Sequence, residues 1–261
     1  EACGLCYTSG TTGNPKGVLY SHRANVLHAY GCAMPDSLCL SARDVLLPVV
    51  PMFHANSWGV TYAAPMVGAK LVLPGPKLAD GRLLCDLVES EGVTISAGVP
   101  TVWLALLEYL RESGRTLETM DRTVIGGSAC PQSMMEEFRD RHGVTVLHAW
   151  GMTESSPLGT INVAMPGEEA LDEAVRTERR LKQGRPVPGV ELKIVDDHGA
   201  ELPWDGVAFG ALKMRGPWVC SDYYNLGAPS EAHAEAGWFE TGDVATIDPD
   251  GYVKLTDRTK D

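Results

Sequence analysis

The sequence predicts an α/β fold: a mostly parallel sheet flanked by helices, followed by a small antiparallel β-barrel-like subdomain. Through the first two thirds of the chain, short apolar runs alternate with amphipathic helical segments, as in β-α-β winding. Residues 45–50 are continuously apolar, which is typical of a strand buried on both faces. The last third changes to strands in which apolar and charged residues alternate, joined by tight turns.

The elements of the first part are expected in strict alternation. Strands are predicted at 2–7, 17–21, 45–50, 70–73, 93–97, 122–125 and 144–147. Helices are predicted after a Ser21 cap, at 57–67, around 83–88, at 101–111 after Pro100, and at 131–141. Each helix lies between two strands that can pair in parallel, so both faces of the sheet would be covered.

The second part starts after a highly charged segment, 168–182, which predicts an exposed helix or a mobile loop. Strands are expected at 190–195, 211–215 and 252–255, and Asp248-Pro249-Asp250-Gly251 has the composition of a hairpin turn. We therefore divide the chain into an α/β nucleotide- and acyl-binding subdomain (1–183), a β subdomain (184–256) and the start of a hinge (257–261).

Composition narrows the function. The net charge of −12 repels nucleic acid phosphates, and no apolar run is long enough to span a bilayer. The first residues given lack the charged and apolar regions of a signal peptide. Of seven cysteines, Cys3 and Cys6 form a lone C-x-x-C pair without the further ligands of a zinc site. Unpaired, irregularly spaced cysteines favour a reducing compartment, so we expect a cytoplasmic protein that does not bind nucleic acid.

The most informative segment is residues 7–17, which read Tyr-Thr-Ser-Gly-Thr-Thr-Gly-Asn-Pro-Lys-Gly. Glycines allow close backbone approach to a polyanion, hydroxyls donate hydrogen bonds, and the lysine supplies countercharge. A Walker A loop needs glycine before the lysine and Ser or Thr after it, but here Pro15 precedes Lys16 and Gly17 follows it. The segment therefore predicts a phosphate-binding loop of another kind.

Further motifs follow in one order along the chain. They are Pro51-Met52-Phe53-His54, Gly126-Gly127-Ser128-Ala129, Trp150-Gly151-Met152-Thr153-Glu154, Thr241-Gly242-Asp243 and Asp257-Arg258-Thr259-Lys260-Asp261. With these motifs the chain resembles the AMP-forming adenylate superfamily of acyl-CoA synthetases, luciferases and peptide-synthetase adenylation domains. The stretch from Met52 to Trp58 is most similar to medium- and long-chain fatty-acyl-CoA synthetases.

The resemblance implies a set of ATP- or AMP-binding residues. They are Thr8, Ser9, Gly10, Thr11, Thr12, Gly13, Lys16, Gly127, Ser128, Ala129, Trp150, Gly151, Met152, Thr153, Asp243 and Arg258. The loop would hold the β- and γ-phosphates, and Trp150 would stack on adenine. Thr153 would donate to the α-phosphate, and the Asp243 carboxylate would accept hydrogen bonds from the ribose hydroxyls.

The resemblance also implies the chemistry. Lys16, His54, Thr153 and Glu154 would be catalytic, with Glu154 as the ligand of Mg²⁺. The acyl site and its gate would comprise His54, Trp58 and Gly127, with Trp58 four residues after His54. Lys260 lies where the interdomain hinge of the family falls.

The implied reaction is attack of a fatty carboxylate on ATP, giving acyl-AMP and pyrophosphate, and then transfer of the acyl group to CoA. Mg²⁺, ATP and CoA are the expected cofactors and partners, and the full-length protein is expected to form a homodimer. Family members carry a segment before the phosphate loop and a C-terminal lid domain, so we expect a fragment that is itself inactive. Three alternatives stay open: an aryl-CoA ligase, a peptide-synthetase-type adenylation domain, or a non-catalytic nucleotide-binding relative.

Overall fold

The computed structural model describes residues 1–8, 14–225, 227 and 230–258, whose strands form three sheets. The central sheet has the order β4-β3-β5-β6-β7-β8-β9. Its strands are β3 (Val45–Val49), β4 (Lys70–Leu71), β5 (Ile95–Gly98), β6 (Arg122–Ile125), β7 (Thr145–Gly151), β8 (Leu158–Ile161) and β9 (Arg185–Pro186). The strands from β4 to β7 pair in parallel, whereas β8 and β9 join antiparallel. The predicted mostly parallel sheet is confirmed.

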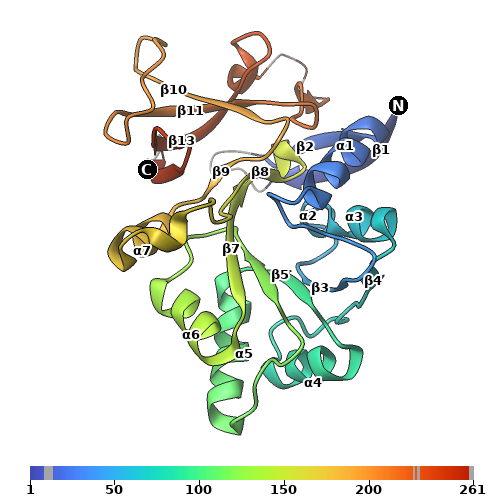
Figure 1. Ribbon diagram of the computed structural model, residues 1–261. Helices are drawn as coiled ribbons and strands as arrows, with labels where there is room; N and C mark the ends of the chain where they lie inside the picture. The colour runs from blue at the N-terminus through green and yellow to red at the C-terminus, as the bar shows by residue number, and fades with distance from the viewer. Residues whose placement is uncertain (9–13, 226, 228–229, 259–261) are drawn as a thin grey trace.

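Helices cover both faces of this sheet, as Figure 1 shows. On β3, Leu46 belongs to the core shared with one set of helices and Leu47 to the core shared with the other. The first set is α1 (His22–Ala33) and α3 (Val60–Val67). The second set is α4 (Gly81–Glu91), α5 (Pro100–Ser113) and α6 (Gln132–His142). Because both faces are buried, β3 is apolar along its whole length, which explains why it could be recognised as a continuous run.

The antiparallel sheet of the second part has the order β10-β11-β13-β14. Its strands are β10 (Glu191–Val195), β11 (Phe209–Arg215), β13 (Phe239–Ile247) and β14 (Val253–Arg258). The predicted antiparallel subdomain is confirmed, and within the described residues it is an open sheet with β10 and β14 at its edges. It lies beyond the carboxyl ends of the parallel strands (Figure 1). The division at 183/184 stays a prediction.

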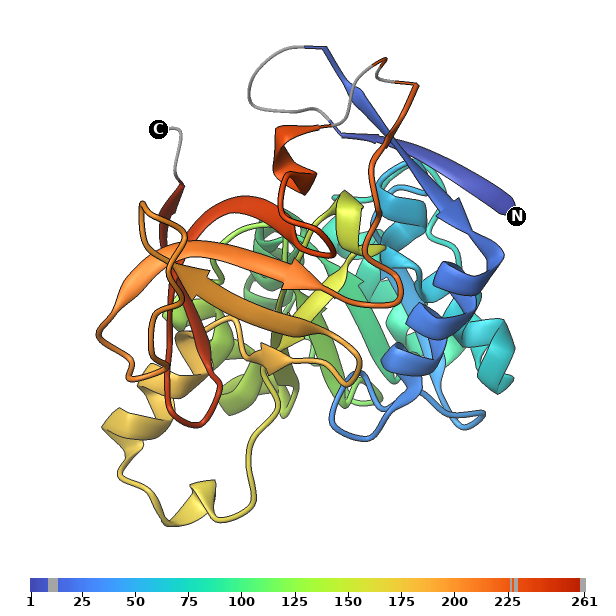
Figure 2. The ribbon, with the colours of Figure 1, turned by 90° about the horizontal axis from the view of Figure 1, so that it is seen from above.

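The third sheet joins distant parts of the chain. Strands β1 (Ala2–Thr8) and β2 (Lys16–Ser21) form a hairpin, and β12 (Tyr223–Tyr224) pairs antiparallel with β2. The short helix η3 (Glu231–His233), which follows β12, lies between this sheet and the four-stranded sheet in Figure 2. The two-residue strand β12 thus connects the late part of the chain to the N-terminal hairpin.

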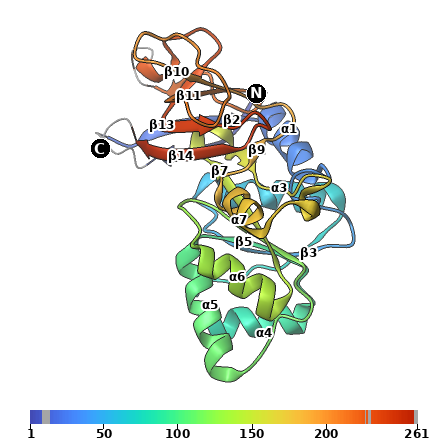
Figure 3. The ribbon, with the colours of Figure 1, turned by 60° about the vertical axis from the view of Figure 1, so that its left-hand side comes forward.

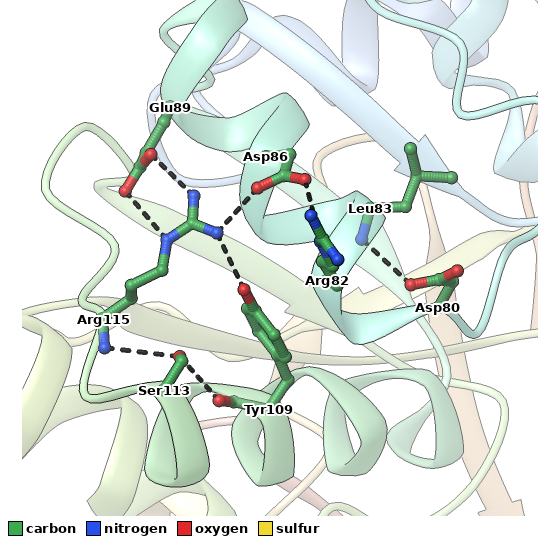
Figure 4. Close-up of polar contacts among 8 residues, drawn as sticks. All are labelled: Asp80, Arg82, Leu83, Asp86, Glu89, Tyr109, Ser113 and Arg115. Carbon is green, nitrogen blue, oxygen red and sulfur yellow. Dashed lines mark hydrogen bonds and ion pairs between the residues drawn. The ribbon is translucent and has the colours of Figure 1, made fainter.

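Local side chains set the starts of two helices. Ser21 caps α1 by accepting from the amide of Ala24, as the sequence predicted, and the Asp80 side chain caps α4 through the amide of Leu83. Figure 4 shows how Arg115, just after α5, reaches across to α4. Its guanidinium binds Asp86 and Glu89 and donates to the Tyr109 hydroxyl. These contacts tie α4 and α5 together at the surface.

The helix expected at 57–67 is wrong at its start. Residues 55–58 form a single left-handed turn labelled α2 (Ala55–Trp58), and the right-handed helix α3 begins only at Val60. Ala55, Asn56, Ser57 and Trp58 all have φ between 45° and 57°. Apolar periodicity does not encode handedness, so this turn could not be predicted from the spacing of apolar residues.

One strand boundary needs correction, and the exposed helix expected in the charged segment is present. The strand predicted to end at 147 continues to Gly151, so Trp150 lies on β7 rather than after it. The charged segment 168–182 contains the 3₁₀ helix η2 (Glu168–Ala170) and the exposed helix α7 (Glu173–Leu181), but Glu168 itself is buried. Figure 3 shows α7 between the four-stranded sheet and α6, and it bonds to both through Arg179 with Asp250 and Glu173 with Arg139. Strands β8, β9, β12 and β13 had no clear sequence signal.

Membrane-spanning segments were sought among the described residues. None of the helices there combines enough length with enough apolar character to cross a bilayer.

Candidate functional site

A large cavity of about 1150 Å³ lies where the three sheets approach one another. Segments from the other motifs that the sequence singled out contribute to its lining, whereas the side chains of the last motif, Asp257 to Asp261, lie outside what the structure describes. The predicted site residues that line it are Thr8, Lys16, His54, Trp58, Gly127, Ser128, Ala129, Trp150, Gly151, Met152, Thr153, Glu154 and Asp243. The structure therefore brings these residues to one cavity, at the carboxyl ends of the parallel strands, where open α/β sheets place their ligands.

The N-terminal hairpin contributes two of these residues. Thr8 ends β1 and Lys16 begins β2, and the two are direct partners across the hairpin. The Lys16 ammonium lies over the Tyr223 ring, 4.8 Å from its centroid. Ser9, Gly10, Thr11, Thr12 and Gly13 lie outside the described residues.

The segment after β7 places a buried carboxylate in the cavity wall. Glu154 is 5% exposed, and its Oε1 accepts a hydrogen bond of 2.6 Å from the Tyr223 hydroxyl. The preceding residue, Thr153, is fixed by its carbonyl, which accepts 2.7 Å from the Tyr20 hydroxyl. Burial, reinforced by the neighbouring Glu154 charge, raises the pKa of Tyr223, so its hydroxyl stays a donor. A buried carboxylate held in this way keeps one oxygen fixed.

Asp243 lies on β13 opposite Trp150. The indole N–H of Trp150 donates to Asp243 Oδ2 at 2.9 Å, and both side chains are 8% exposed. The sequence reasoning assigned Trp150 to adenine stacking and missed this bond, which fixes the carboxylate. Arg258 is the register partner of Asp243 across β13 and β14, and its role towards the ribose and phosphate stays a prediction. Lys260 lies outside the described residues.

The glycine segment after β6 allows a close approach of Trp58. A Cβ atom built on Gly126 would lie 2.9 Å from the carbonyl oxygen of Ala149 and 3.5 Å from the Trp58 ring. Gly127 has φ +78, and a Cβ atom on it would lie 3.7 Å from the same ring. Both distances to the Trp58 ring are ordinary van der Waals contacts, so the indole packs beside the glycine segment; glycine itself is favoured by the Ala149 carbonyl at position 126 and by the positive φ at position 127.

His54 lies at the exposed rim of the cavity, directly before the left-handed turn. Partial desolvation by the cavity wall lowers its pKa, which favours the neutral imidazole. The turn itself is costly, because the left-handed conformation disfavours L-residues by roughly 1–2 kcal/mol each. Such strain is characteristic of functional sites.

Several lining residues gave no sequence signal. Tyr223 and Gln183 come from segments without a motif, and His148 lies two residues before Trp150 on β7. His148 is 2% exposed, its Nδ1 has no hydrogen-bond partner, and burial lowers its pKa. Alternation along the strand would have placed His148 and Trp150 on one face, had β7 been extended far enough.

The cavity is lined by both polar and apolar side chains. The polar lining includes Lys16, Thr153, Glu154 and Asp243, and the apolar lining includes a set of buried side chains. That apolar set comprises Cys32, Leu38, Val60, Ala97, Val124 and Leu158. Burial raises the pKa of the Cys32 thiol to about 12, so it behaves there as a small apolar group.

The donor set determines which metal could bind. Among the described residues no group of three or more His, Cys, Asp or Glu side chains converges to hold an ion. Mg²⁺ needs only one or two carboxylates when it arrives with substrate phosphates. The single carboxylate of Glu154, facing the cavity beside Thr153, fits that requirement and does not fit a resident transition metal.

The described arrangement is an α/β fold with one cavity lined by the lysine that begins β2, a buried carboxylate and a second acid on an adjoining sheet. Comparison with known proteins makes the assignment specific. A model of the AMP-binding enzyme family matches residues 1–224, so the chain belongs to that family.

Individual relatives agree. The chain is 57% identical, over all of its length, to 47% of a medium-chain-fatty-acid–CoA ligase from Ectopseudomonas oleovorans. It is 55% identical, again over all of its length, to 48% of a 3-methylmercaptopropionyl-CoA ligase from Ruegeria pomeroyi. An o-succinylbenzoate coenzyme A synthetase from Bacillus subtilis, solved with ATP and magnesium ion, has a TM-score of 0.82 and 28% identity, covering 98% of this chain and 50% of that chain. The chain spans about half the length of these relatives.

Proposed function

We propose that this chain belongs to a longer protein that activates a fatty carboxylic acid with ATP and transfers the acyl group to CoA. One observation carries the proposal: a single cavity is lined both by polar side chains suited to a nucleotide and by buried apolar side chains suited to an acyl chain. Membership of the AMP-binding enzyme family and identity to acyl-CoA ligases support it.

The polar side chains of the cavity lining would hold the nucleotide. Lys16 would supply countercharge to the phosphates at the mouth of the hairpin, and Thr8 would donate from its hydroxyl. Asp243, fixed by the Trp150 indole, would accept from the ribose hydroxyls. Thr153 would donate to the α-phosphate, with its backbone held by Tyr20.

The fatty acid would bind against the apolar side chains of the cavity lining. Its alkyl chain would occupy the space lined by Cys32, Leu38, Val60 and Val124, with Trp58 between that space and the glycine segment. His54, neutral because its pKa is lowered, would donate to or accept from the carboxylate without adding a fixed charge.

A carboxylate is a weak nucleophile towards a polyanion, so the rate depends on positioning and on charge neutralisation rather than on a strong base. Lys16 and Thr153 would keep the α-phosphate in place, and the cavity wall would exclude water from the acyl-phosphate bond. Magnesium would add Lewis-acid charge at the phosphates, and Glu154 is the residue that would hold it. Transfer to CoA would complete the reaction in the longer protein.

The test is ATP–pyrophosphate exchange by the full-length protein, with a panel of acids. We expect magnesium-dependent exchange that rises with alkyl length and is lost in Asp243→Ala. Asp86→Ala is the matched control, because it removes a surface carboxylate of α4 that binds Arg115. This variant should retain exchange. Full exchange in Asp243→Ala, or exchange indifferent to the acid, would contradict the proposal.

Other acids are the main alternative. One relative, 55% identical to this chain, is named for a short sulfur-containing acid, 3-methylmercaptopropionate. Methylthio acids and aryl acids in the same panel therefore distinguish a fatty-acid enzyme from its neighbours. A cytoplasmic location and a homodimer of the longer protein are further parts of this proposal.

A further inference from the structure

The left-handed turn at residues 55–59 is the most unusual backbone segment in the described chain. Four consecutive residues with side chains, Ala55 to Trp58, have positive φ, and Gly59 continues the run with φ +68. Elsewhere in the described chain, non-glycine residues with positive φ occur singly, at Cys39, Ser156 and Asn225. Something must hold this run against its intrinsic preference.

Side chains of this segment supply the restraint. The Ser57 hydroxyl is fully buried and donates to the carbonyl oxygen of Val50 at 2.8 Å, which ties the turn to the end of β3. On the other side, the Thr61 hydroxyl donates to the carbonyl oxygen of Asn56 at 3.0 Å. The amide of Gly59 closes the turn onto Ala55 and Asn56.

The handedness of the turn sets the place of Trp58. Reversal of the φ signs would project the side chains of the turn in other directions, so the contact of the indole with Gly126 and Gly127 depends on the left-handed form. Trp58, the glycine segment and the apolar residues Val60, Ala97 and Val124 all line the same cavity. The indole therefore lines the cavity beside the glycine segment.

We infer that Ser57 is a positioning residue: by holding the left-handed turn through Val50, it keeps the Trp58 indole against the glycine segment and so sets how an acyl chain fits. The inference rests on the proposed function for its kinetic consequence. Its structural content, the dependence of Trp58 on Ser57, stands independently of any activity.

The experiment uses the full-length protein and four single variants. Ser57→Ala removes the hydroxyl that holds the turn, and Thr61→Val removes the weaker restraint on the same segment. Ser96→Ala is the matched control, because Ser96 is an equally buried serine whose hydroxyl donates to a strand carbonyl, that of Leu47, away from the cavity. Trp58→Phe, made in each background, isolates the emission of Trp58 by difference.

We expect Ser57→Ala to shift the Trp58 emission to longer wavelength and to increase its quenching by acrylamide. The kcat/KM for long acids should fall on the order of 10- to 100-fold through a misplaced indole, with the KM for ATP unchanged. Thr61→Val should act in the same direction and more weakly. Ser96→Ala should lower thermal stability as much as Ser57→Ala and leave both readouts unchanged.

A rescue separates backbone positioning from simple loss of a contact. Glycine adopts the left-handed region without steric cost, so Asn56→Gly added to Ser57→Ala should restore part of the Trp58 emission and of the acid selectivity. If Ser57→Ala fails to fold, Thr61→Val with and without Asn56→Gly decides the same point.

Unchanged Trp58 emission in Ser57→Ala, or equal effects of Ser57→Ala and Ser96→Ala on acid selectivity, would overturn the inference. Absence of exchange in the parent would instead contradict the proposed function, and the emission measurements would still judge the turn.

Discussion

The two sides of the central sheet treat unfavourable backbone conformations differently. On the side of α4, α5 and α6, each helix ends in a left-handed glycine, Gly92, Gly114 and Gly143, where glycine adopts that conformation at no steric cost. On the cavity side, Ala55 to Trp58 and Ser156 carry positive φ with side chains in place. The scaffold side follows local preferences and the cavity side violates them, which locates the functional part of the molecule independently of any motif.

The largest effect is expected on the scaffold side, where a change should affect stability and leave the site intact. Phe138 is fully buried on α6 and packs edge-on against Trp103, with ring centroids 6.0 Å apart. Phe138→Ala should destabilise the fold by about 3–5 kcal/mol in urea unfolding, because it leaves a cavity in a close-packed core. The ATP dissociation constant of the folded variant should match that of the parent. If folded Phe138→Ala bound ATP more weakly than the parent at low temperature, the contrast between the two sides of the sheet would be wrong.

A change on the cavity side should do the reverse. Glu154→Gln keeps an oxygen that accepts from Tyr223 but removes the charge, so unfolding should hardly change. ATP–pyrophosphate exchange by the full-length protein should fall on the order of 10²- to 10³-fold, as for loss of one preorganised electrostatic group. Tyr223→Phe, which retains the carboxylate, should lose less. Exchange that survives Glu154→Gln would remove Glu154 from the site.

The smallest effect concerns His28, a residue of the cavity side that should also affect stability. His28 is 1% exposed, its Nε2 accepts from the amide of Leu158, and burial lowers its pKa to about 4. The folded state therefore keeps His28 neutral while the unfolded chain takes up a proton near pH 6.5, so stability falls as pH decreases from 6.5 to 4. The loss should be roughly 3 kcal/mol at most, at 1.36 kcal/mol per pKa unit.

The measurement is urea unfolding of the parent and of His28→Gln across that pH range. The Gln oxygen can still accept from Leu158, and the difference between the two proteins isolates His28 from His54, His142 and His148, whose pKa values are also lowered. Parallel pH profiles would show that His28 is not the group that titrates.

Elements with strong local signals were predictable from sequence. The Ser21 cap, the start of α5 at Pro100 and the buried strand β3 all follow from residues adjacent in the chain. The left-handed turn and the two-residue strands β9 and β12 were not predictable, because their conformation is imposed by contacts from distant parts of the chain. Tertiary context overrides local propensity there.

The site shows the same division. Motifs identified Thr8, Lys16, Trp58, Glu154 and Asp243, which line one cavity, although their roles remain predictions. Their partners Tyr20 and Tyr223 were missed, since a tyrosine that positions a motif residue looks locally like any strand tyrosine. The bond between Trp150 and Asp243 was missed for a related reason, because 93 residues separate the two along the chain.

The pairing of β12 with β2 has a consequence for synthesis on the ribosome. Tyr223 and Tyr224 complete the sheet that begins with residues 2–21, so the N-terminal hairpin waits for some two hundred further residues to emerge before its third strand is available. Until then one edge of β2 is open, and the Glu154 side chain lacks the hydroxyl that fixes it. Nascent chains stalled before Tyr223 should thus expose a free strand edge to chaperones, and chains released after it should not.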